Sequence, residues 1–256
     1  MQTQTSPQPD TRVKPLVALR AIRALFRNKE DTGQVFKVVE ALKGDSILRN
    51  FERFKASETG AKILGDRRQL IDTLCNKDYL ANLPENSYGK AYQDFLTSEN
   101  LTAEGLVSAS EEAPRWGSRE ADMALFTARL RDSHDLHHVL TGYGRNPVGE
   151  LCTLTFSYPH TRNRGIGVLV LIGMFKIKKD MRDVPVFKIV RQAYRNGKKA
   201  AWLPGVDWEA MLPLPLEEVR RQLNILPPTE YQKIEKCLKC KEADYQSQHT
   251  GMPQPA

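Results

Sequence analysis

Three of the five histidines of the chain lie between positions 134 and 138, in the sequence HDLHH. On a helix, residues four positions apart share a face, so His134 and His138 can point at one ion, as in zinc motifs of the H-E-x-x-H type. Asp135 lies three residues before His138, and at about 100° per residue all three side chains fit within an arc of roughly 100°. The spacing therefore predicts two neutral imidazoles and one carboxylate around a common point.

A fourth ligand can come from the segment that follows. Residues 141–147 contain two glycines and a proline, so the helix cannot continue through them. A new helix is predicted to begin near Val148, which brings the carboxylate of Glu150 back towards the histidines. Two histidines with two carboxylates suit Zn²⁺, and two histidines with one carboxylate and open positions also suit non-haem Fe²⁺. A hydrogen-bonded histidine cluster without a metal is the alternative interpretation.

Helical spacing of apolar residues dominates the rest of the chain, and the sequence contains no internal repeat and no low-complexity linker. We predict a single compact all-α domain of about eight to ten helices, with the metal site between two consecutive helices. The predicted domain covers residues 11–226, between a disordered N-terminus at 1–10 and a loosely ordered extension at 227–256. The predicted helices are 15–27, 35–42, 47–54, 70–74, 88–96, 102–108, 118–140, one from about 148, 166–175 and 216–223.

Composition narrows the class of protein. The chain has 256 residues, of which 40% are hydrophobic and 27% are charged, and this suits a soluble globular domain with a core of its own. Its four cysteines form no secreted-type framework, and the pair Cys237 and Cys240 lacks a second pair for a zinc ribbon, so we interpret both as ordinary thiols. We expect neither a secretory signal nor a membrane-spanning helix, because no long apolar run occurs.

Positive charge is concentrated in one segment. The formal net charge is +7, yet residues 161–200 alone hold eleven basic and two acidic residues. Such a segment can face an anionic partner, such as lipid headgroups or a phosphorylated ligand, and an ordinary solvated face is the alternative. We do not expect nucleic acid as a partner, because no recognition motif accompanies the basic residues.

The most apolar window, residues 166–175, is followed at once by a run of lysines. This window is too short to cross a bilayer. It suits a helix that lies at a membrane interface or lines a groove for a lipid tail, and a buried core helix with a charged last turn is the alternative. The lipid-facing candidates are Leu169, Ile172, Phe175, Lys176, Lys178 and Lys179.

The sequence HDLHH, followed after eleven residues by Glu150, resembles the metal-ligand signature of the ubiquinone (coenzyme Q) biosynthesis protein 4 family. The segment 83–89, LPENSYG, is similar to a second motif of that family. The resemblance runs from about residue 11 to residue 226, and the chain departs from the family in the basic segment 176–199 and in the C-terminal extension from about Pro227. The other segments that share the resemblance are 58–64, Trp208-Glu209 and 216–223.

This resemblance implies a helical fold and a divalent metal, zinc or alternatively iron, held by His134, Asp135, His138 and Glu150. It implies removal of the ring carboxyl at carbon 1 of a polyprenylated 4-hydroxybenzoate, a carbon–carbon lyase reaction that is in some accounts oxidative. The other implied role is a non-catalytic lipid-binding scaffold that organises the biosynthetic enzymes. Arg145, in the turn, is our candidate to hold the substrate carboxylate, because guanidinium binds carboxylates through two parallel hydrogen bonds. A solvated loop arginine is the alternative.

The same resemblance implies four kinds of partner: a polyprenylated quinone precursor or other isoprenoid lipid, a membrane surface, other ubiquinone biosynthetic proteins and a second copy of the chain. We therefore expect a peripheral protein at the cytoplasmic face of the inner membrane. In a eukaryote the expected place is the matrix side of the mitochondrial inner membrane.

Overall fold

The computed structural model of the chain describes residues 11–27, 32–99, 101 and 121–235. Within these ranges the chain forms fourteen α-helices, one short 3-10 helix, a further helical segment at 229–235 and an isolated β-bridge, without a strand. The predicted all-α class is confirmed. The helix count exceeds the prediction, partly because several helices have only one or two turns, which apolar periodicity does not reveal.

The helices are α1 Pro15–Arg27, α2 Thr32–Leu42, α3 Ser46–Lys55, α4 Glu58–Gly65, α5 Leu70–Leu74, α6 Lys77–Ala81, α7 Tyr88–Ser98, α9 Ala121–Asp132, α10 His134–Thr141, α11 Pro147–Thr161, α12 Arg164–Asp180, α13 Val186–Lys199, η1 Leu203–Gly205, α14 Trp208–Met211 and α15 Leu216–Gln222. Six of them begin at a side chain that accepts hydrogen bonds from first-turn N–H groups. These N-caps are Ser57 for α4, Asn76 for α6, Ser87 for α7, Asn146 for α11, Asn163 for α12 and Asp207 for α14.

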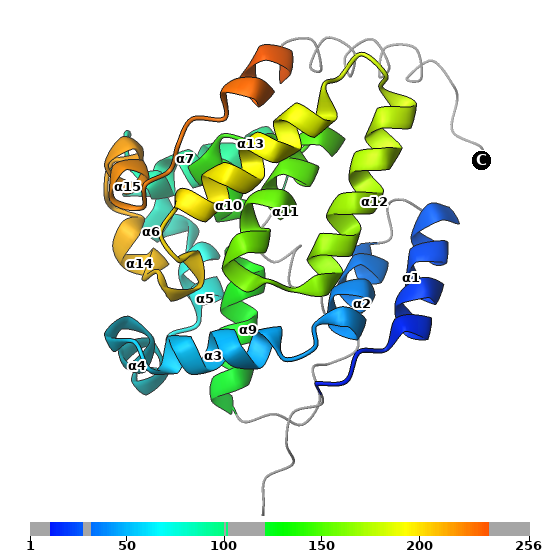
Figure 1. Cartoon of the computed structure of the whole chain (residues 1–256). Coiled ribbons are helices and arrows are strands. Elements are labelled where there is room, and N and C mark those ends of the chain that lie inside the picture. The colour runs from blue at the N-terminus through cyan, green and yellow to red at the C-terminus, as the bar shows by residue number, and fades with distance from the viewer. Residues whose placement is uncertain (1–10, 28–31, 100, 102–120, 236–256) are drawn as a thin grey trace, which may run out of the picture.

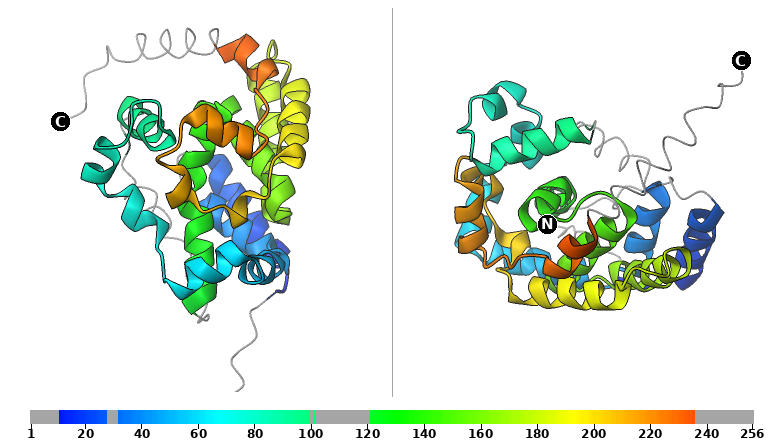
Figure 2. Two further views of the ribbon diagram at one scale, coloured as in Figure 1. Left: turned by 90° about the vertical axis from the view of Figure 1, so that its left-hand side faces the viewer. Right: turned by 90° about the horizontal axis from the view of Figure 1, so that it is seen from above.

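Helix α11 is the central element of the fold. It packs against α13 and α12, and α2 covers the other side of α12 and in turn carries α1 (Figure 1). In the view from above, the green segment that contains α9 to α11 lies in the middle, with earlier and later parts of the chain around it (Figure 2). Gly197 allows this packing, because a Cβ atom there would lie 2.1 Å from the carbonyl oxygen of Phe156. A larger residue would push α13 away from α11.

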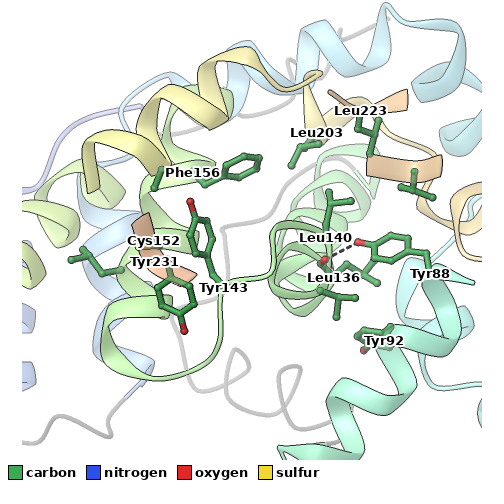
Figure 3. Close-up of a cluster of buried hydrophobic side chains, with 14 of the residues drawn as sticks. Tyr88, Tyr92, Leu136, Leu140, Tyr143, Cys152, Phe156, Leu203, Leu223 and Tyr231 are labelled. Carbon is green, nitrogen blue, oxygen red and sulfur yellow. Dashed lines mark hydrogen bonds between the residues drawn. The ribbon is translucent and has the colours of Figure 1, made fainter. Parts of the chain in front are cut away.

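The main core cluster joins α10 and α11 to α7, α13 and the C-terminal helices. Figure 3 shows Leu136, Leu140, Phe156 and Leu203 in this cluster. Tyr88 is completely buried and donates a hydrogen bond of 2.7 Å to the carbonyl of Leu136, so its hydroxyl has a partner. Burial of each such large apolar side chain stabilises the fold by about 1.5–3 kcal/mol. The core therefore fixes α10, the helix that carries the histidines.

The predicted continuous helix over 118–140 is wrong, since its described part is two helices. Helix α9 ends at Asp132 and α10 begins at His134. Between them, Ser133 donates its hydroxyl to the carbonyl of Leu130, a local hydrogen bond of the kind that bends helices. The predicted helix at 102–108 lies outside the described residues.

Two elements differ from the sequence prediction on the C-terminal side. Helix α13 was not predicted, although its apolar residues lie on one face. Residues 229–235, at the start of the predicted loose extension, are helical, and Tyr231 is completely buried. This part of the extension therefore packs onto the domain. Residues 1–10 and 236–256, including Cys237 and Cys240, lie outside the described residues.

Candidate metal centre

Two histidines of α10 and one glutamate of α11 converge at one point. The Nε2 atoms of His134 and His138 lie 3.3 Å apart, and Glu150 Oε2 lies 3.5 Å from the first and 3.4 Å from the second. The helical spacing of four residues aligns the histidines, and the turn at 142–146 brings the first turn of α11 beside them. The arrangement is a nearly equilateral triangle of two imidazole nitrogens and one carboxylate oxygen.

The triangle has the size that a small divalent cation requires. Ligands of a tetrahedral ion at bond lengths of about 2.0–2.1 Å lie about 3.3–3.4 Å from one another, which matches the three separations. The donor types also fit, because neutral imidazole and carboxylate are common ligands of zinc and iron. His134, His138 and Glu150 could therefore hold a divalent metal ion together.

His138 is held in the orientation and tautomer that metal binding needs. Its Nδ1 atom lies 3.0 Å from the carbonyl oxygen of Tyr143, which can only accept a hydrogen bond, so Nδ1 carries the proton. The lone pair of Nε2 is then directed at the other two ligands. Phe95 of α7 stacks on the imidazole at 5.8 Å, with 16° between the rings, and the side chain is completely buried.

Glu150 directs its two carboxylate oxygens to different groups. Oε2 faces the histidines, and Oε1 lies 3.4 Å from Nε of Arg145. Burial alone would raise the pKa of Glu150, but its interactions with His134 and His138 outweigh burial and hold the pKa far below its usual value. Burial likewise would lower the pKa of His134, but Glu150 and, to a smaller extent, Asp135 raise it. Glu150 is thus ionised near neutral pH.

Glycines shape the turn that joins the two helices. Gly142 ends α10 with φ of +75°, a conformation that favours glycine. A Cβ atom on Gly149 would lie 1.9 Å from the carbonyl oxygen of Gly144, so the turn and the first turn of α11 can approach this closely only when residue 149 is glycine. This contact fixes the backbone next to Glu150.

Two distant side chains hold the turn and the end of α10. Tyr231 accepts hydrogen bonds at its hydroxyl from the backbone N–H of Gly144, at 3.0 Å, and from Asn146 Nδ2, at 2.7 Å. Arg220 of α15 donates to the carbonyls of Leu140 and Val139, at 2.9 and 3.0 Å, and so satisfies the C-terminal end of α10. Figure 3 shows Tyr231 beside Tyr143.

The predicted site residues fall into two groups. His134, His138 and Glu150 come together, and Arg145 lies beside them, with its side chain 36% exposed. Asp135 is buried on α10 next to His134, but in the described part of the chain it does not belong to the group of converging ligand atoms. Its role as a ligand remains a prediction.

The lipid-facing candidates on α12 differ in their exposure to solvent. Leu169 is buried in a cluster with Ala21 of α1 and Val38 of α2, so the structure removes it from that surface. Phe175 is 62% exposed and lies edge-on to Phe187 of α13, and Lys178 and Lys179 are exposed as well, whereas Ile172 and Lys176 are half-buried. None of the helices in the described ranges combines the length and the apolar character that a bilayer span requires.

Sequence reasoning missed the residues that support the ligands. Tyr231 was assigned to the loose extension, although the prolines at 227–228 precede Tyr231 and Ile234 at helical spacing, which is a weak signal. Phe95 was recognised only as an apolar helix residue. Nothing in the sequence near Arg220 indicates that it caps a helix eighty residues away.

Comparison with known proteins places these residues in a family. The family model for Coenzyme Q (ubiquinone) biosynthesis protein Coq4 matches residues 10–229. Among curated relatives, "Ubiquinone biosynthesis protein COQ4, mitochondrial" of Podospora anserina is 30% identical over 190 residues, covering 73% of this chain and 60% of that protein. The protein of the same name from Clavispora lusitaniae is 26% identical over 215 residues, covering 82% of this chain and 65% of that protein.

A solved structure has the same fold. The crystal structure of a protein assigned to ubiquinone biosynthesis, from Nostoc punctiforme, superposes with a TM-score of 0.61 at 20% sequence identity. The superposition covers 83% of this chain and 98% of the Nostoc chain. The chain spans 60% and 65% of the length of the two fungal relatives. From the family match, the chain belongs to the coenzyme Q (ubiquinone) biosynthesis protein Coq4 family.

Proposed function

We propose that this chain acts in ubiquinone biosynthesis as a metal-dependent lyase, which removes the ring carboxyl at carbon 1 of a polyprenylated 4-hydroxybenzoate. The observation that carries the proposal is the triangle formed by His134, His138 and Glu150, with sides of 3.3–3.5 Å. The family supports the pathway, and the donor set supports a metal.

Zinc is the metal we propose, with iron as the alternative, and Asp135 is proposed as a further ligand from the resemblance. A divalent ion held by these residues would supply Lewis-acid stabilisation of the negative charge that develops when a carboxylate is lost. The protein keeps His138 and Glu150 in fixed orientations through Tyr143 and Arg145, so the ligand set needs little rearrangement.

Arg145 is proposed to position the substrate. It approaches Glu150 only through Nε, and its side chain is partly exposed. The two terminal nitrogens can therefore bind the ring carboxylate in a forked arrangement, next to the metal ligands. Arg145 would orient the substrate rather than carry out the bond cleavage.

The substrate tail implies a membrane-peripheral position. A polyprenyl chain partitions into lipid by about 0.8 kcal/mol per buried CH₂ unit, so the protein has to meet it at a bilayer. Exposed apolar side chains on α1 and α12 lie next to basic residues, an arrangement suited to anionic headgroups. The two fungal relatives are mitochondrial by name. We propose the matrix side of the mitochondrial inner membrane, or the cytoplasmic face in a bacterium.

The second candidate is a lipid-binding scaffold for the biosynthetic enzymes, with the metal site kept for structure. The exposed apolar side chains favour it, because they suit contact with lipid, other pathway proteins or a second copy of the chain, whether or not the protein turns over a substrate.

Turnover by the purified, metal-loaded chain separates the two functions. With a short-chain prenylated 4-hydroxybenzoate, the lyase proposal predicts CO₂ release that is abolished in Glu150→Gln and lowered at least tenfold in Arg145→Gln. Glu217→Gln, at a carboxylate that is 81% exposed, is the matched control and should keep wild-type activity. Lipid binding without any CO₂ release would contradict the lyase and support the scaffold.

A further inference from the structure

A second polar site lies at the opposite end of α11 from the metal centre. A pocket of about 590 Å³ opens between the C-terminal ends of α11 and α13 and the side of α3. His160, which lines it, is ten residues beyond Glu150, so the two sites are about 15 Å apart along the helix. The residues that give the pocket its character are Arg53, Arg162, Lys198, Tyr158, Tyr194 and Trp202.

The pocket is strongly positive. Its three cations are Arg53, Arg162 and Lys198, and no acidic side chain contributes to its lining. As far as the structure describes the chain, none of the three lies within 4.0 Å of a carboxylate oxygen, whereas both basic residues of α15 are paired. The C-terminal ends of α11 and α13 each carry about −0.5 charge, which offsets about one of the three positive charges. A net positive pocket remains.

Aromatic rings, rather than carboxylates, contact two of these cations. The guanidinium of Arg53 lies over Trp202, 4.0 Å from the ring centroid, and Lys198 Nζ lies 5.9 Å from the centroid of Tyr194. Trp202 is itself fixed, because its Nε1 donates to the carbonyl of His160. Cations positioned in this way keep their hydrogen-bond donors for an anion.

His160 adds an unsatisfied polar atom to the same site. Its side chain is buried, and its Nε2 has no hydrogen-bond partner in the described residues. Buried polar atoms are normally paired, and an unpaired one at the wall of a pocket suggests a ligand oxygen or water as partner. A ligand with several oxygens and a negative charge would satisfy His160 and the three cations together.

An exposed aromatic stripe leads away from the pocket. Phe187 and Tyr194 are seven residues apart on α13 and share a face with Lys198, and the ring of Phe187 meets Phe175 of α12 at 6.2 Å. The exposed fractions of Phe175, Phe187 and Tyr194 are 62%, 48% and 39%. Phosphate-binding groups at one end of an exposed apolar stripe match the headgroup and chains of a lipid.

We propose that this pocket binds the phosphate headgroup of an anionic lipid, with the stripe of Tyr194, Phe187 and Phe175 lying against its acyl chains. The inference rests on the membrane part of the proposed function and is independent of the metal and of the ring carboxyl. It assigns the basic segment a specific ligand site, in place of a diffuse attraction to the membrane.

Vesicle flotation of the whole chain tests this site. The probes are vesicles of phosphatidylcholine alone and vesicles that also contain phosphatidic acid, with soluble glycerol 3-phosphate as competitor. Arg53→Gln and Lys198→Gln are the pocket variants. Lys55→Gln on α3 and Lys199→Gln on α13 are the matched controls, because each removes one exposed charge from the same helix outside the pocket. Thermal unfolding and metal content are measured for every variant.

We expect wild type to prefer vesicles with phosphatidic acid. Each pocket variant should weaken that binding roughly fivefold or more and each control at most about twofold, with metal content unchanged throughout. Equal losses in pocket and control variants would overturn the proposal in favour of general charge attraction. If the pocket bound glycerol 3-phosphate but the protein showed no preference for phosphatidic acid vesicles, the proposal that the phosphate belongs to a lipid would be overturned. Loss of metal in the Glu150 variant with intact vesicle binding would separate this site from the metal centre.

Discussion

His138 and Glu150 belong to consecutive helices, and the Nε2 atom of the first lies 3.4 Å from the Oε2 atom of the second. Neither side chain can move freely, because Tyr143 holds the imidazole and Arg145 approaches the other carboxylate oxygen. An ionised carboxylate beside two imidazoles in a partly buried position is an arrangement that a divalent cation stabilises. The packing of α10 against α11 therefore creates a group of side chains that suits a divalent cation.

Replacement of Gly149 by alanine should disrupt the metal centre through the backbone. The new Cβ atom would meet the carbonyl of Gly144 at 1.9 Å, so the turn has to move away from α11. We expect a loss of unfolding free energy of about 2 kcal/mol or more and at least a tenfold weaker metal affinity. Urea denaturation and metal titration measure the two effects.

Gly65→Ala is the control, because nothing lies within 4 Å of a Cβ atom there. It should leave metal affinity unchanged and stabilise the fold by up to about 1 kcal/mol. Equal metal affinities in the two variants would show that the turn does not position Glu150.

Tyr231→Phe should weaken the site from a distance. The hydroxyl of Tyr231 accepts from Gly144 N–H and from Asn146 Nδ2, and its removal leaves both donors without that partner. The expected cost is about 1–3 kcal/mol of unfolding free energy, together with weaker metal binding. Tyr194→Phe, at an exposed ring, is the matched control. If both variants bound metal as well as wild type, the hydroxyl of Tyr231 would have no role in positioning the turn.

The part of the site that could be predicted from sequence is the part encoded locally. His134 and His138 share a helix, and two glycines and a proline force the turn before Glu150, so the convergence of these three side chains follows from spacing alone. Tyr231 and Arg220 act on the same turn and helix from about eighty to ninety positions away, and no local pattern reveals such contacts.

The difference between local and distant contacts also explains where the fold predicted from sequence is wrong. The break between α9 and α10 falls at a single residue, Ser133, within an apolar pattern that is otherwise continuous. Helix α13 has its buried residues Val186, Ile189 and Ala193 at helical spacing, but the five basic residues of this helix favour a charged surface segment. Leu169 looked lipid-facing because its partners on α1 and α2 lie far away in sequence.

A buried ion pair should contribute strongly to stability far from the metal. Arg129 of α9 and Glu209 of α14 form two parallel hydrogen bonds of 2.6 and 2.7 Å, and Arg129 is 5% exposed. Arg129→Met leaves the carboxylate of Glu209 without its two hydrogen bonds and with only Arg68, at 4.0 Å, as a cationic neighbour, so it should lower the unfolding free energy by about 3 kcal/mol. The double variant Arg129→Met with Glu209→Met should lose less than the sum of the single variants, because no unpaired charge remains. Additive losses in urea denaturation would contradict the pairing.

Stability should fall in mild acid because of His160. Burial, with a smaller contribution from Arg53, lowers the pKa of His160 to about 4. The unfolded chain, with an ordinary histidine pKa of about 6.5, binds a proton between these values and the folded chain does not. Neutral His160 therefore makes its full contribution to the unfolding free energy above about pH 6.5. This contribution falls by up to about 3 kcal/mol as the pH drops towards 4.

His160→Phe removes this titration, so its unfolding free energy should change less between pH 6.5 and 4 than that of wild type. Part of the slope should remain, because burial also lowers the pKa of His137. Identical slopes in the two proteins, measured by denaturation across this pH range, would contradict the assignment.

The most direct test of the metal centre is the metal content of the purified chain, determined by elemental analysis for wild type, His138→Ala and Glu150→Gln. His160→Ala and Glu217→Gln serve as controls that remove the same chemical groups away from the site. We predict about one divalent ion per chain in wild type and both controls, and loss of most of it in the two site variants. A full complement of metal in His138→Ala and Glu150→Gln would contradict the ligand assignment.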